Sequence, residues 1–320
     1  MKFYPLKLAP VLKSAIWGGK SIPETFGIGE KGQSVAEAWM MTDREDGVNL
    51  IENGAYTGMS LDEYIKQAGS ENVYGEGTFP LLIKIIDAAD KLSVQVHPDN
   101  AYAASHGLDA GKTEMWYVLS AKEGASLVSG LREGVTPQAL KESALDGTCE
   151  NNLNYVPVKK GDCFYIPAGL VHAIGEGILI AEIQQNSNTT YRLYDYDRVG
   201  ADGKKREIHI DKAAEVVKTQ FDMSGVTVGK EVYDKNGIKT AILCKCDYFS
   251  VMRMNLEKNV SAAFAEKGNM KHLLFTEGSG YLRCGDARYP FIKGNSYLLP
   301  KACPMVEVFA EEDAEVIVSC

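Results

Sequence analysis

Two histidines and a glutamate stand at strand-like positions from which their side chains could meet. In the run KLSVQVHPDN (91–100), polar and aliphatic residues alternate, so Gln95 and His97 point to the same face of a strand. Glu114 opens the apolar run EMWYVLSA, and His172 follows the strand pattern CFYIPAG. Two imidazoles, a carboxylate and an amide suit Zn²⁺ or another first-row ion of borderline softness, and they leave coordination positions open for water or substrate. The sequence therefore predicts a metal centre of the catalytic type, with the ligands Gln95, His97, Glu114 and His172.

A second interpretation of the same stretch is a polar strand face in solvent, because this alternation is also typical of half-exposed strands. The chain has five histidines, and two of them fall on these strand positions, which favours the metal centre. Gln95 offers the weakest of the four donors, because zinc prefers imidazole, thiolate and carboxylate ligands. The other histidines are expected to be exposed or structural: His106, His209 and His272.

The elements that must position these side chains are mostly strands. Short β-branched or aromatic runs separated by Gly, Pro and Asp are typical of a β-sandwich or barrel. Helix signals are fewer: Ser60 starts a capping box, Thr136 precedes a proline at a first helical position, and a third helix is expected at 211–218. The predicted strands are LLIKIIDA (81–88), KLSVQVH (91–97), EMWYVLSA (114–121), CFYIPAG (163–169), GILIAEIQQ (177–185), HLLFTEG (272–278) and NSYLLP (295–300).

An internal repeat indicates two β-barrels in tandem. The segments KKGDCFYIPAGLVHAI (159–174) and IKGNSYLLPKACPMVEV (292–308) each place a glycine six residues before a proline. The first copy has His172 where the second has Met305, so the second barrel is expected to lack the metal and to pack against or shape the first. The polar stretch at 222–236 suggests the boundary between them.

The composition narrows the class of protein. The chain has 320 residues, 45% of them hydrophobic, which is enough for a substantial core and for two domains. A net charge of −9 argues against a general nucleic-acid-binding surface. The seven cysteines have no CxxC spacing, and no apolar run suits a signal peptide or a membrane span. We therefore expect a cytoplasmic protein with reduced thiols and with neither a nucleic-acid nor a membrane partner.

Several of these runs together resemble type I mannose-6-phosphate isomerases (phosphomannose isomerases) of the short bacterial kind. The runs are KLSVQVHPDN, KTEMWYVL and GDCFYIPAGLVHAIGEGILIAEIQQNSNTTYRLYDYDR, with AIWGG (15–19) and VAEAWMMTD (35–43). The resemblance implies a mainly β fold of tandem cupin-type barrels (double-stranded β-helix or jelly roll) with a few short helices. It implies a catalytic metal-binding cupin domain with small helical insertions over 1–225 and a degenerate cupin-like barrel over 226–320. The chain has no room for the extra helical domain of longer members.

The resemblance also implies an activity and assigns residues to it. The activity is the interconversion of mannose 6-phosphate and fructose 6-phosphate, in which a proton moves between C2 and C1 through an enediol. Glu182 is the expected base, and Lys112 is the alternative base or a phosphate contact. Arg192 is the expected active-site arginine, a fixed cation near the reacting oxygens. One Zn²⁺ per chain would be held by the family's metal ligands, which fall on Gln95, His97, Glu114 and His172.

Other interpretations stay open at this point. Arg192 could form a structural ion pair with Asp195 or Asp197. The phosphate could be bound by Lys112 and Arg192, with Lys84 or Arg198 as further donors, although the family's phosphate site draws partly on segments that have no counterpart here. The expected partner is a small phosphosugar, and the expected assembly is a monomer or a weak homodimer.

Two rival functions belong to other classes of cupin. An iron dioxygenase usually places two close histidines on the first motif, whereas Gln95 takes one of those positions here. A non-catalytic sugar-binding cupin would need no acid–base group, so the presence of Glu182 and Arg192 is weak evidence against that function.

Overall fold

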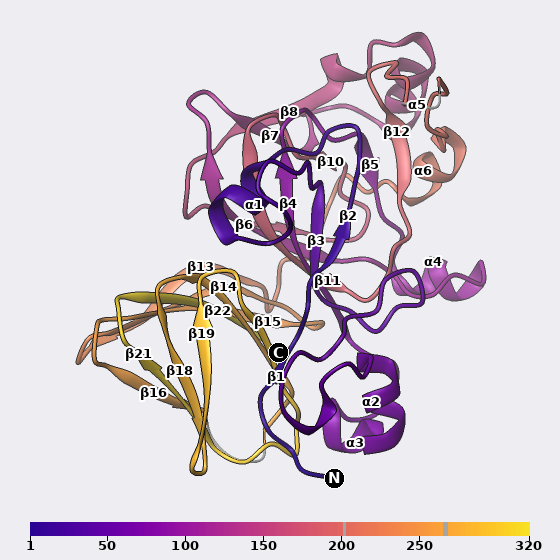
Figure 1. Ribbon diagram of the computed structural model, residues 1–320. Coiled ribbons are helices and arrows are strands. Elements are labelled where there is room, and N and C mark those ends of the chain that lie inside the picture. The colour runs from indigo at the N-terminus through magenta and orange to yellow at the C-terminus, as the bar shows by residue number, and fades with distance from the viewer. Residues whose placement is uncertain (201–202, 265–267) are drawn as a thin grey trace.

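The strands form two lobes, and the mainly β prediction is confirmed. The structure is a computed structural model that describes residues 1–200, 203–264 and 268–320. Each lobe is a pair of sheets packed against a shared apolar core. Figure 1 shows the C-terminal strands, orange to yellow, gathered in one lobe, and the indigo and magenta strands that precede them in the other.

The first lobe holds every residue of the predicted metal centre. Its two sheets pack through a core that includes Trp116 from the larger sheet and Leu127 from the smaller one. In strand order, the six-stranded sheet is β2 (Val11–Lys13), β3 (Glu37–Met41), β4 (Leu81–Ala88), β11 (Ile178–Gln185), β6 (Glu114–Ala121) and β9 (Cys163–Ile166). The five-stranded sheet is β12 (Tyr191–Tyr194), β5 (Val94–Val96), β10 (His172–Ala173), β7 (Ser126–Leu131) and β8 (Leu153–Pro157).

The second lobe contains the C-terminal strands and one strand from the start of the chain. β1 (Leu6–Lys7) pairs with β20 of this lobe, although it belongs by sequence to the first half. In strand order, the seven-stranded sheet is β1, β20 (Ser296–Leu299), β17 (Lys271–Glu277), β22 (Ala314–Ser319), β15 (Ser250–Leu256), β14 (Ile238–Lys245) and β13 (Thr227–Lys235). The four-stranded sheet is β16 (Ser261–Phe264), β21 (Val306–Ala310), β18 (Ser279–Cys284) and β19 (Ala287–Ile292).

Successive residues of the central strands point into different cores. On β6, Trp116 packs between the two sheets of the first lobe, whereas Met115 and Tyr117 join a core that lies between the lobes. On β22, Val316 packs within the second lobe and Ile317 joins the interlobe core. Both faces of these strands are therefore buried, which explains why their sequences read as continuous apolar runs.

The three predicted helices are present. Ser60 forms the predicted capping box with Glu63, and the Thr136 side chain accepts a hydrogen bond from the backbone N–H of Ala139. A further short helix that the sequence did not predict, α4, has its N-terminus capped by Asp99. The helices are α1 (Ser21–Phe26), α2 (Leu61–Ala68), α3 (Ser70–Val73), α4 (Asn100–Ser105), α5 (Pro137–Asp146) and α6 (Ile210–Val216), with 3₁₀ turns η1 (Gly54–Tyr56) and η2 (Cys149–Asn152).

The polar stretch at 222–236 is mostly strand rather than linker. β13 occupies 227–235 at the edge of the seven-stranded sheet, and nearly all of its side chains are exposed. The pattern that suggested a boundary is that of an edge strand, whose side chains have little to pack against. The division into 1–225 and 226–320 stays a prediction.

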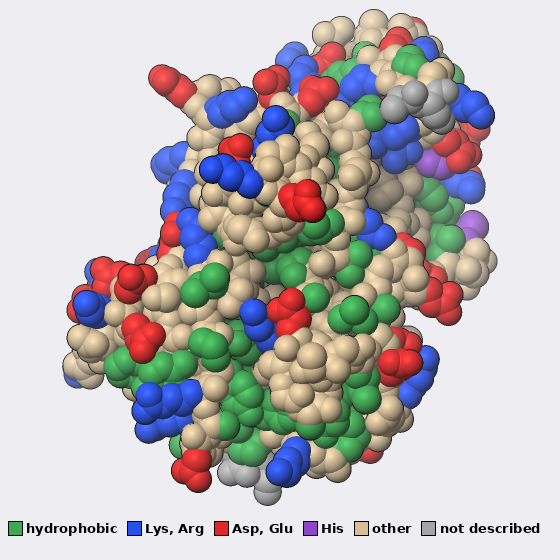
Figure 2. All heavy atoms as spheres, in the orientation of Figure 1, with side chains coloured by type: hydrophobic (Ala, Val, Ile, Leu, Met, Phe, Trp, Pro, Cys, Tyr) green, Lys and Arg blue, Asp and Glu red, His purple; other side chains and the backbone are tan. Residues whose placement is uncertain are grey.

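The surface carries charges of both signs. On the face shown in Figure 2, Lys and Arg side chains alternate with Asp and Glu and form no continuous basic area. In the described parts of the chain, none of the helices has the length and apolar character that a membrane crossing requires. All seven cysteines are free thiols, as predicted.

Candidate metal centre and active-site cavity

Three of the four predicted ligands converge inside the first lobe. His97 directly follows β5, Glu114 opens β6 and His172 opens β10. The Nε2 atoms of the two histidines are 3.1 Å apart. Glu114 Oε2 lies 3.4 Å from His97 Nε2, and Glu114 Oε1 lies 3.5 Å from His172 Nε2. All three side chains are almost fully buried, so the cluster is a preformed set of donor atoms.

The hydrogen bonds of the two imidazoles show what this cluster can hold. His97 Nδ1 lies 3.0 Å from the backbone oxygen of Thr189, and His172 Nδ1 lies 2.8 Å from that of Leu170. Because a carbonyl oxygen only accepts, each Nδ1 carries the proton and each Nε2 presents a lone pair. Within the described chain, Glu114 Oε1 accepts no hydrogen bond, and the charged group nearest to Oε2 is the Lys112 ammonium. Lone pairs that meet without a proton between them fit a cation, and the Nδ1 bonds fix both rings for that purpose.

The charge states agree with a metal centre. Burial, helped by the Lys112 ammonium, lowers the pKa of His97 to about 3, and burial also lowers the pKa of His172. Burial alone would raise the pKa of Glu114, but the Lys112 ammonium holds it well below the usual range. Near neutral pH the cluster is therefore two neutral imidazoles and one carboxylate, the forms that bind metal. Lys112 Nζ lies 3.1 Å from Glu114 Oε2.

Gln95, the fourth predicted ligand, lies next to this cluster in the sheet. It stands opposite His172 in the pairing of β5 with β10, and it is two residues before His97 on the same strand face. The Gln95 side chain is only partly buried and lines a cavity. Its role as a ligand stays a prediction.

A cavity of about 330 Å³ adjoins the cluster and collects the other predicted site residues. Gln95, Lys112, Glu182 and Arg192 all contribute to its wall. Residues that sequence reasoning did not assign to the reaction line it as well: Trp17, Glu37, Lys84, Arg206 and His209.

Strand register explains the surroundings of Glu182. On β11 it stands between Lys84 of β4 and Trp116 of β6. Glu182 Oε1 lies 3.2 Å from Lys84 Nζ, and Trp116 Nε1 donates to Glu182 Oε2 at 3.1 Å. Burial and the charge of Glu114 raise the pKa of Glu182, and Lys84 opposes that rise. The carboxylate is therefore held in one orientation, and its pKa lies above that of an exposed glutamate.

Lys84 is part of a buried chain of charges. Its ammonium lies between Glu182 and Glu37, with 3.3 Å to Glu37 Oε2. Trp39 Nε1 donates to the same Glu37 oxygen at 2.6 Å. The whole of β4 is buried, so its sequence gave no sign of which residues face the cavity.

Arg192 does not form the ion pair that the sequence left open. Its Nε donates to Ser93 Oγ at 3.2 Å, and one terminal nitrogen donates to the backbone oxygen of Glu207 at 2.8 Å. Asp195 and Asp197 pair with other cations. Among the described residues, no carboxylate lies within ion-pair distance of Arg192, so its charge is available to the cavity.

Comparison with known proteins decides the family. A family model described as "Phosphomannose isomerase type I, catalytic domain" matches residues 6–124, and one described as "Mannose-6-phosphate isomerase, cupin domain" matches residues 239–320. Mannose-6-phosphate isomerase ManA of Bacillus subtilis (strain 168) is 40% identical over 319 residues, which cover 98% of each chain. The chain belongs to the type I phosphomannose isomerase family. The resemblance seen in the sequence and the cupin-type fold are thereby confirmed.

Two further comparisons place the chain among phosphomannose isomerases of known sequence or structure. The mannose-6-phosphate isomerase of Streptococcus mutans is 36% identical over 98% of each chain. The crystal structure of the Bacillus subtilis mannose 6-phosphate isomerase superposes with a TM-score of 0.89 at 33% identity, over 99% of each chain. The fold, including the second lobe, is therefore that of the family over its full length.

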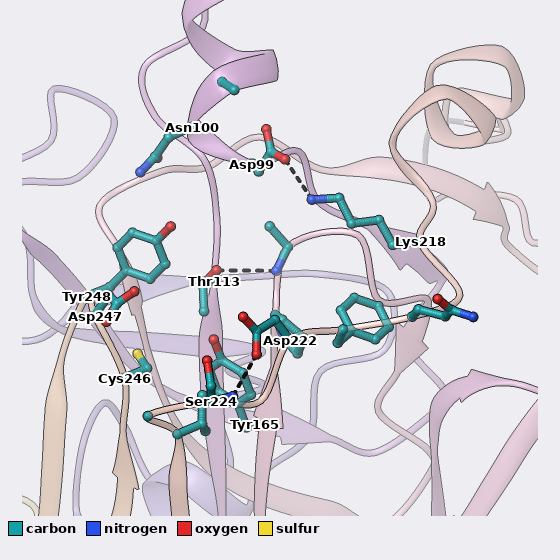
Figure 3. Close-up of a pocket in the computed structure, with 17 residues that line it drawn as sticks. Asp99, Asn100, Thr113, Tyr165, Lys218, Asp222, Ser224, Cys246, Asp247 and Tyr248 are labelled. Carbon is teal, nitrogen blue, oxygen red and sulfur yellow. Dashed lines mark hydrogen bonds and ion pairs between the residues drawn. The ribbon is translucent and has the colours of Figure 1, made fainter.

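A larger cavity of this family member lies elsewhere. It measures about 580 Å³ and is formed between the lobes, with Thr113 on one side and Cys246 and Tyr248 on the other (Figure 3). Figure 3 shows Asp99 bonded to Lys218. No histidine lines this cavity. The smaller cavity, rather than this larger one, is lined by the predicted site residues Gln95, Lys112, Glu182 and Arg192.

Proposed function

We propose that this chain is a zinc-dependent aldose–ketose isomerase that interconverts mannose 6-phosphate and fructose 6-phosphate. One observation carries the proposal: two unprotonated imidazole nitrogens and a carboxylate meet beside Lys112, which lines a polar cavity. The substrate is inferred from the names of the similar Bacillus and Streptococcus proteins, both of which are called mannose-6-phosphate isomerase.

The metal would be one Zn²⁺ per chain, held by His97, Glu114 and His172 with Gln95 as the fourth ligand. Nitrogen and carboxylate donors suit zinc, and the set leaves room for a further ligand. When bound, the ion would act as a Lewis acid that stabilises negative charge on substrate oxygens. The second lobe would hold none, since Met305, which replaces His172 in the repeat, is 57% exposed.

Glu182 is the proposed base that takes the proton from C2 and returns it to C1. It lines the cavity, and the contacts with Lys84 and Trp116 fix its orientation. A pKa raised by burial makes its carboxylate a stronger base. Proton transfer through an enediol needs one such group beside two adjacent carbons.

Lys112 and Arg192 would supply the fixed positive charge of the site. Lys112 is nearly fully buried, and Arg192 is held by Ser93 and by a backbone carbonyl. Fixed cations in a water-poor cavity stabilise the charge that develops on the enediol oxygens without reorganising during the reaction. Lys112 remains the alternative base.

The further proposals concern the cell and the assembly. We place the chain in the cytoplasm, with a phosphosugar as its small-molecule partner, as a monomer or a weak homodimer. The catalytic domain would span 1–225 and the degenerate barrel 226–320.

The decisive experiment incubates the purified chain with mannose 6-phosphate and measures fructose 6-phosphate, with and without a chelator. We expect turnover that the chelator abolishes and zinc restores, and metal analysis should find zinc at one per chain. Turnover that resists the chelator, or none even with added zinc, would contradict the proposal. Iron with oxygen uptake would show a different kind of cupin enzyme.

A further inference from the structure

The segment that follows β12 turns back onto the cavity. Val199 pairs with Lys205 as an isolated bridge, which brings Arg198 and Arg206 to the same carboxylate. Asp195, nearly buried, accepts from Arg198 at 2.6 Å and from Arg206 Nε at 2.8 Å. Arg206 also bonds Asp195 through one terminal nitrogen. Within the described part of the chain its other terminal nitrogen makes no hydrogen bond, and Arg206 lines the cavity.

The residues after Arg206 are bonded to Arg192. The backbone N–H of His209 donates to the Arg192 oxygen at 2.7 Å, and the N–H of Arg192 donates to His209 Nδ1 at 3.2 Å. The Arg192 guanidinium donates to the Glu207 oxygen at 2.8 Å. Since His209 Nδ1 accepts, Nε2 carries the proton of the neutral ring and is a donor, 3.6 Å from the exposed carboxylate of Glu207. Arg192, Arg206 and His209 therefore form one wall of the cavity.

This wall carries the unbalanced positive charge of the cavity. Lys84 has two carboxylates within ion-pair distance, and Lys112 has Glu114. The Arg206 guanidinium shares Asp195 with Arg198, and Arg192 has none among the described residues. Burial and the neighbouring Arg206 lower the pKa of Arg192, as expected where cations crowd together. In a chain of net charge −9, a local excess of cations is what would attract a dianion.

The position of the wall suits the far end of the substrate. Arg192, Gln95 and His172 stand in register on three adjacent strands, β12, β5 and β10. Two strand spacings separate the Cα atoms of Arg192 and His172 by about 10 Å. A six-carbon sugar with its reacting carbons near the histidines can reach that wall with a terminal phosphate.

We propose that Arg206 and His209, next to Arg192, form the subsite that binds the phosphate monoester of the substrate. The proposal rests on the proposed function for the identity of the sugar, but not for the binding of phosphate itself. The guanidinium fork suits phosphate oxygens, Asp195 fixes the fork, and His209 Nε2 adds a neutral donor. Arg198, one of the further phosphate donors that the sequence suggested, bonds Asp195 and Asp90 and does not line this cavity.

The test compares Arg206→Gln with Arg198→Gln in the zinc-loaded full chain. Each variant removes one arginine from Asp195, so Arg198→Gln is the matched control. A charged hydrogen bond is worth about 1.5–3 kcal/mol, so we expect Arg206→Gln to raise KM for mannose 6-phosphate about 10- to 100-fold, with kcat within about threefold. Arg198→Gln should change KM by less than about threefold. His209→Asn, whose side-chain oxygen can still accept from Arg192, should raise KM about 2- to 10-fold.

A second readout does not need turnover. Binding of inorganic phosphate, measured by calorimetry, should weaken about 10- to 100-fold in Arg206→Gln, keep its strength in Arg198→Gln, and leave zinc content unchanged. If Arg206→Gln fails to fold, Arg206→Lys keeps the charge without the fork and should weaken phosphate binding about tenfold.

Equal effects of the two arginine variants would overturn the inference, because the loss would then act through Asp195. Unchanged phosphate binding in Arg206→Gln would overturn it as well. A wild-type chain that binds phosphate through Arg206 but does not isomerise the sugar would refute the proposed function and leave the subsite standing.

Discussion

Replacing Lys112 by glutamine should tighten metal binding while it slows the reaction. The Lys112 ammonium lies 3.1 Å from Glu114 Oε2 and is nearly fully buried. A divalent ion held by the same carboxylate would share it with this fixed positive charge. If Lys112 supplies the cation proposed for the reaction, its removal should strengthen metal binding and lower the rate of the reaction.

The size of the effect follows from the short separation. At about 5 Å, a single and a double positive charge repel by about 1.7 kcal/mol in a water-like medium and by roughly four times that in a protein-like one. Water that enters the space left by Lys112 keeps the result near the lower value. We therefore expect the zinc Kd to fall by at least about tenfold. Loss of the fixed cation should lower kcat by about 10²-fold.

The assay is competition for zinc against a chromophoric chelator at pH 7.5, followed by steady-state kinetics of the zinc-loaded protein. Lys66→Gln is the control, because it removes the same charge from an exposed i, i+4 pair with Asp62 on the surface. It should leave both quantities unchanged. Zinc affinity that is weaker or unchanged in a folded Lys112→Gln would refute the electrostatic argument.

Three further outcomes test other parts of the structure. Glu182→Gln should lower kcat about 10²- to 10⁴-fold with zinc content unchanged; near wild-type turnover would remove Glu182 as the base. Glu37→Gln leaves Lys84 with one close carboxylate, so Lys84 should hold Glu182 more firmly and weaken it as a base, seen as a fall in kcat with little change in KM. Burial lowers the pKa of His272 from 6.5 to about 3, so its contribution to stability is complete above pH 6.5 and is lost as the pH falls toward 3. From pH 7 to pH 5 the wild type should lose about 2 kcal/mol more unfolding free energy in urea than His272→Gln; equal losses would contradict this.

The alternation of residues along the strands predicted which side chains meet at the centre of the site. It could do so because successive side chains of a strand point to opposite faces. His97, Glu114 and His172 sit on strands whose neighbours are apolar, and a period of two fixes which side chains share a face. When the strands pair in the observed register, these three side chains come together. The same rule could not set strand bounds: β5 covers 94–96 rather than 91–97, because pairing partners decide where a strand ends.

The cavity residues that the sequence did not predict lie in a segment without the periodicity of a helix or a strand. The segment at 206–209 is neither strand nor long helix, and His209 was expected to be structural. Its place in the cavity wall comes from hydrogen bonds with Arg192, a residue seventeen positions earlier. Such a contact depends on how a turn closes, which local patterns do not encode. Lys84 was named as a possible phosphate donor, but its ion pairs with Glu182 and Glu37 were not predicted, because every residue of its strand is buried and the pattern marks no cavity face.

The second lobe has a role although none of its described residues form a group that could hold a metal ion. β6 carries Glu114 on one face, and on the other face Met115 and Tyr117 pack in the interlobe core. The Tyr117 hydroxyl lies 3.5 Å from Glu315 Oε2 of β22, and that carboxylate also accepts from Thr276 at 2.8 Å. A donor set that must meet within a few tenths of an ångström needs strands that cannot shift. The second lobe supplies that support by packing against the face of β6 opposite Glu114. This packing gives a physical reason why the fold of the second lobe is retained.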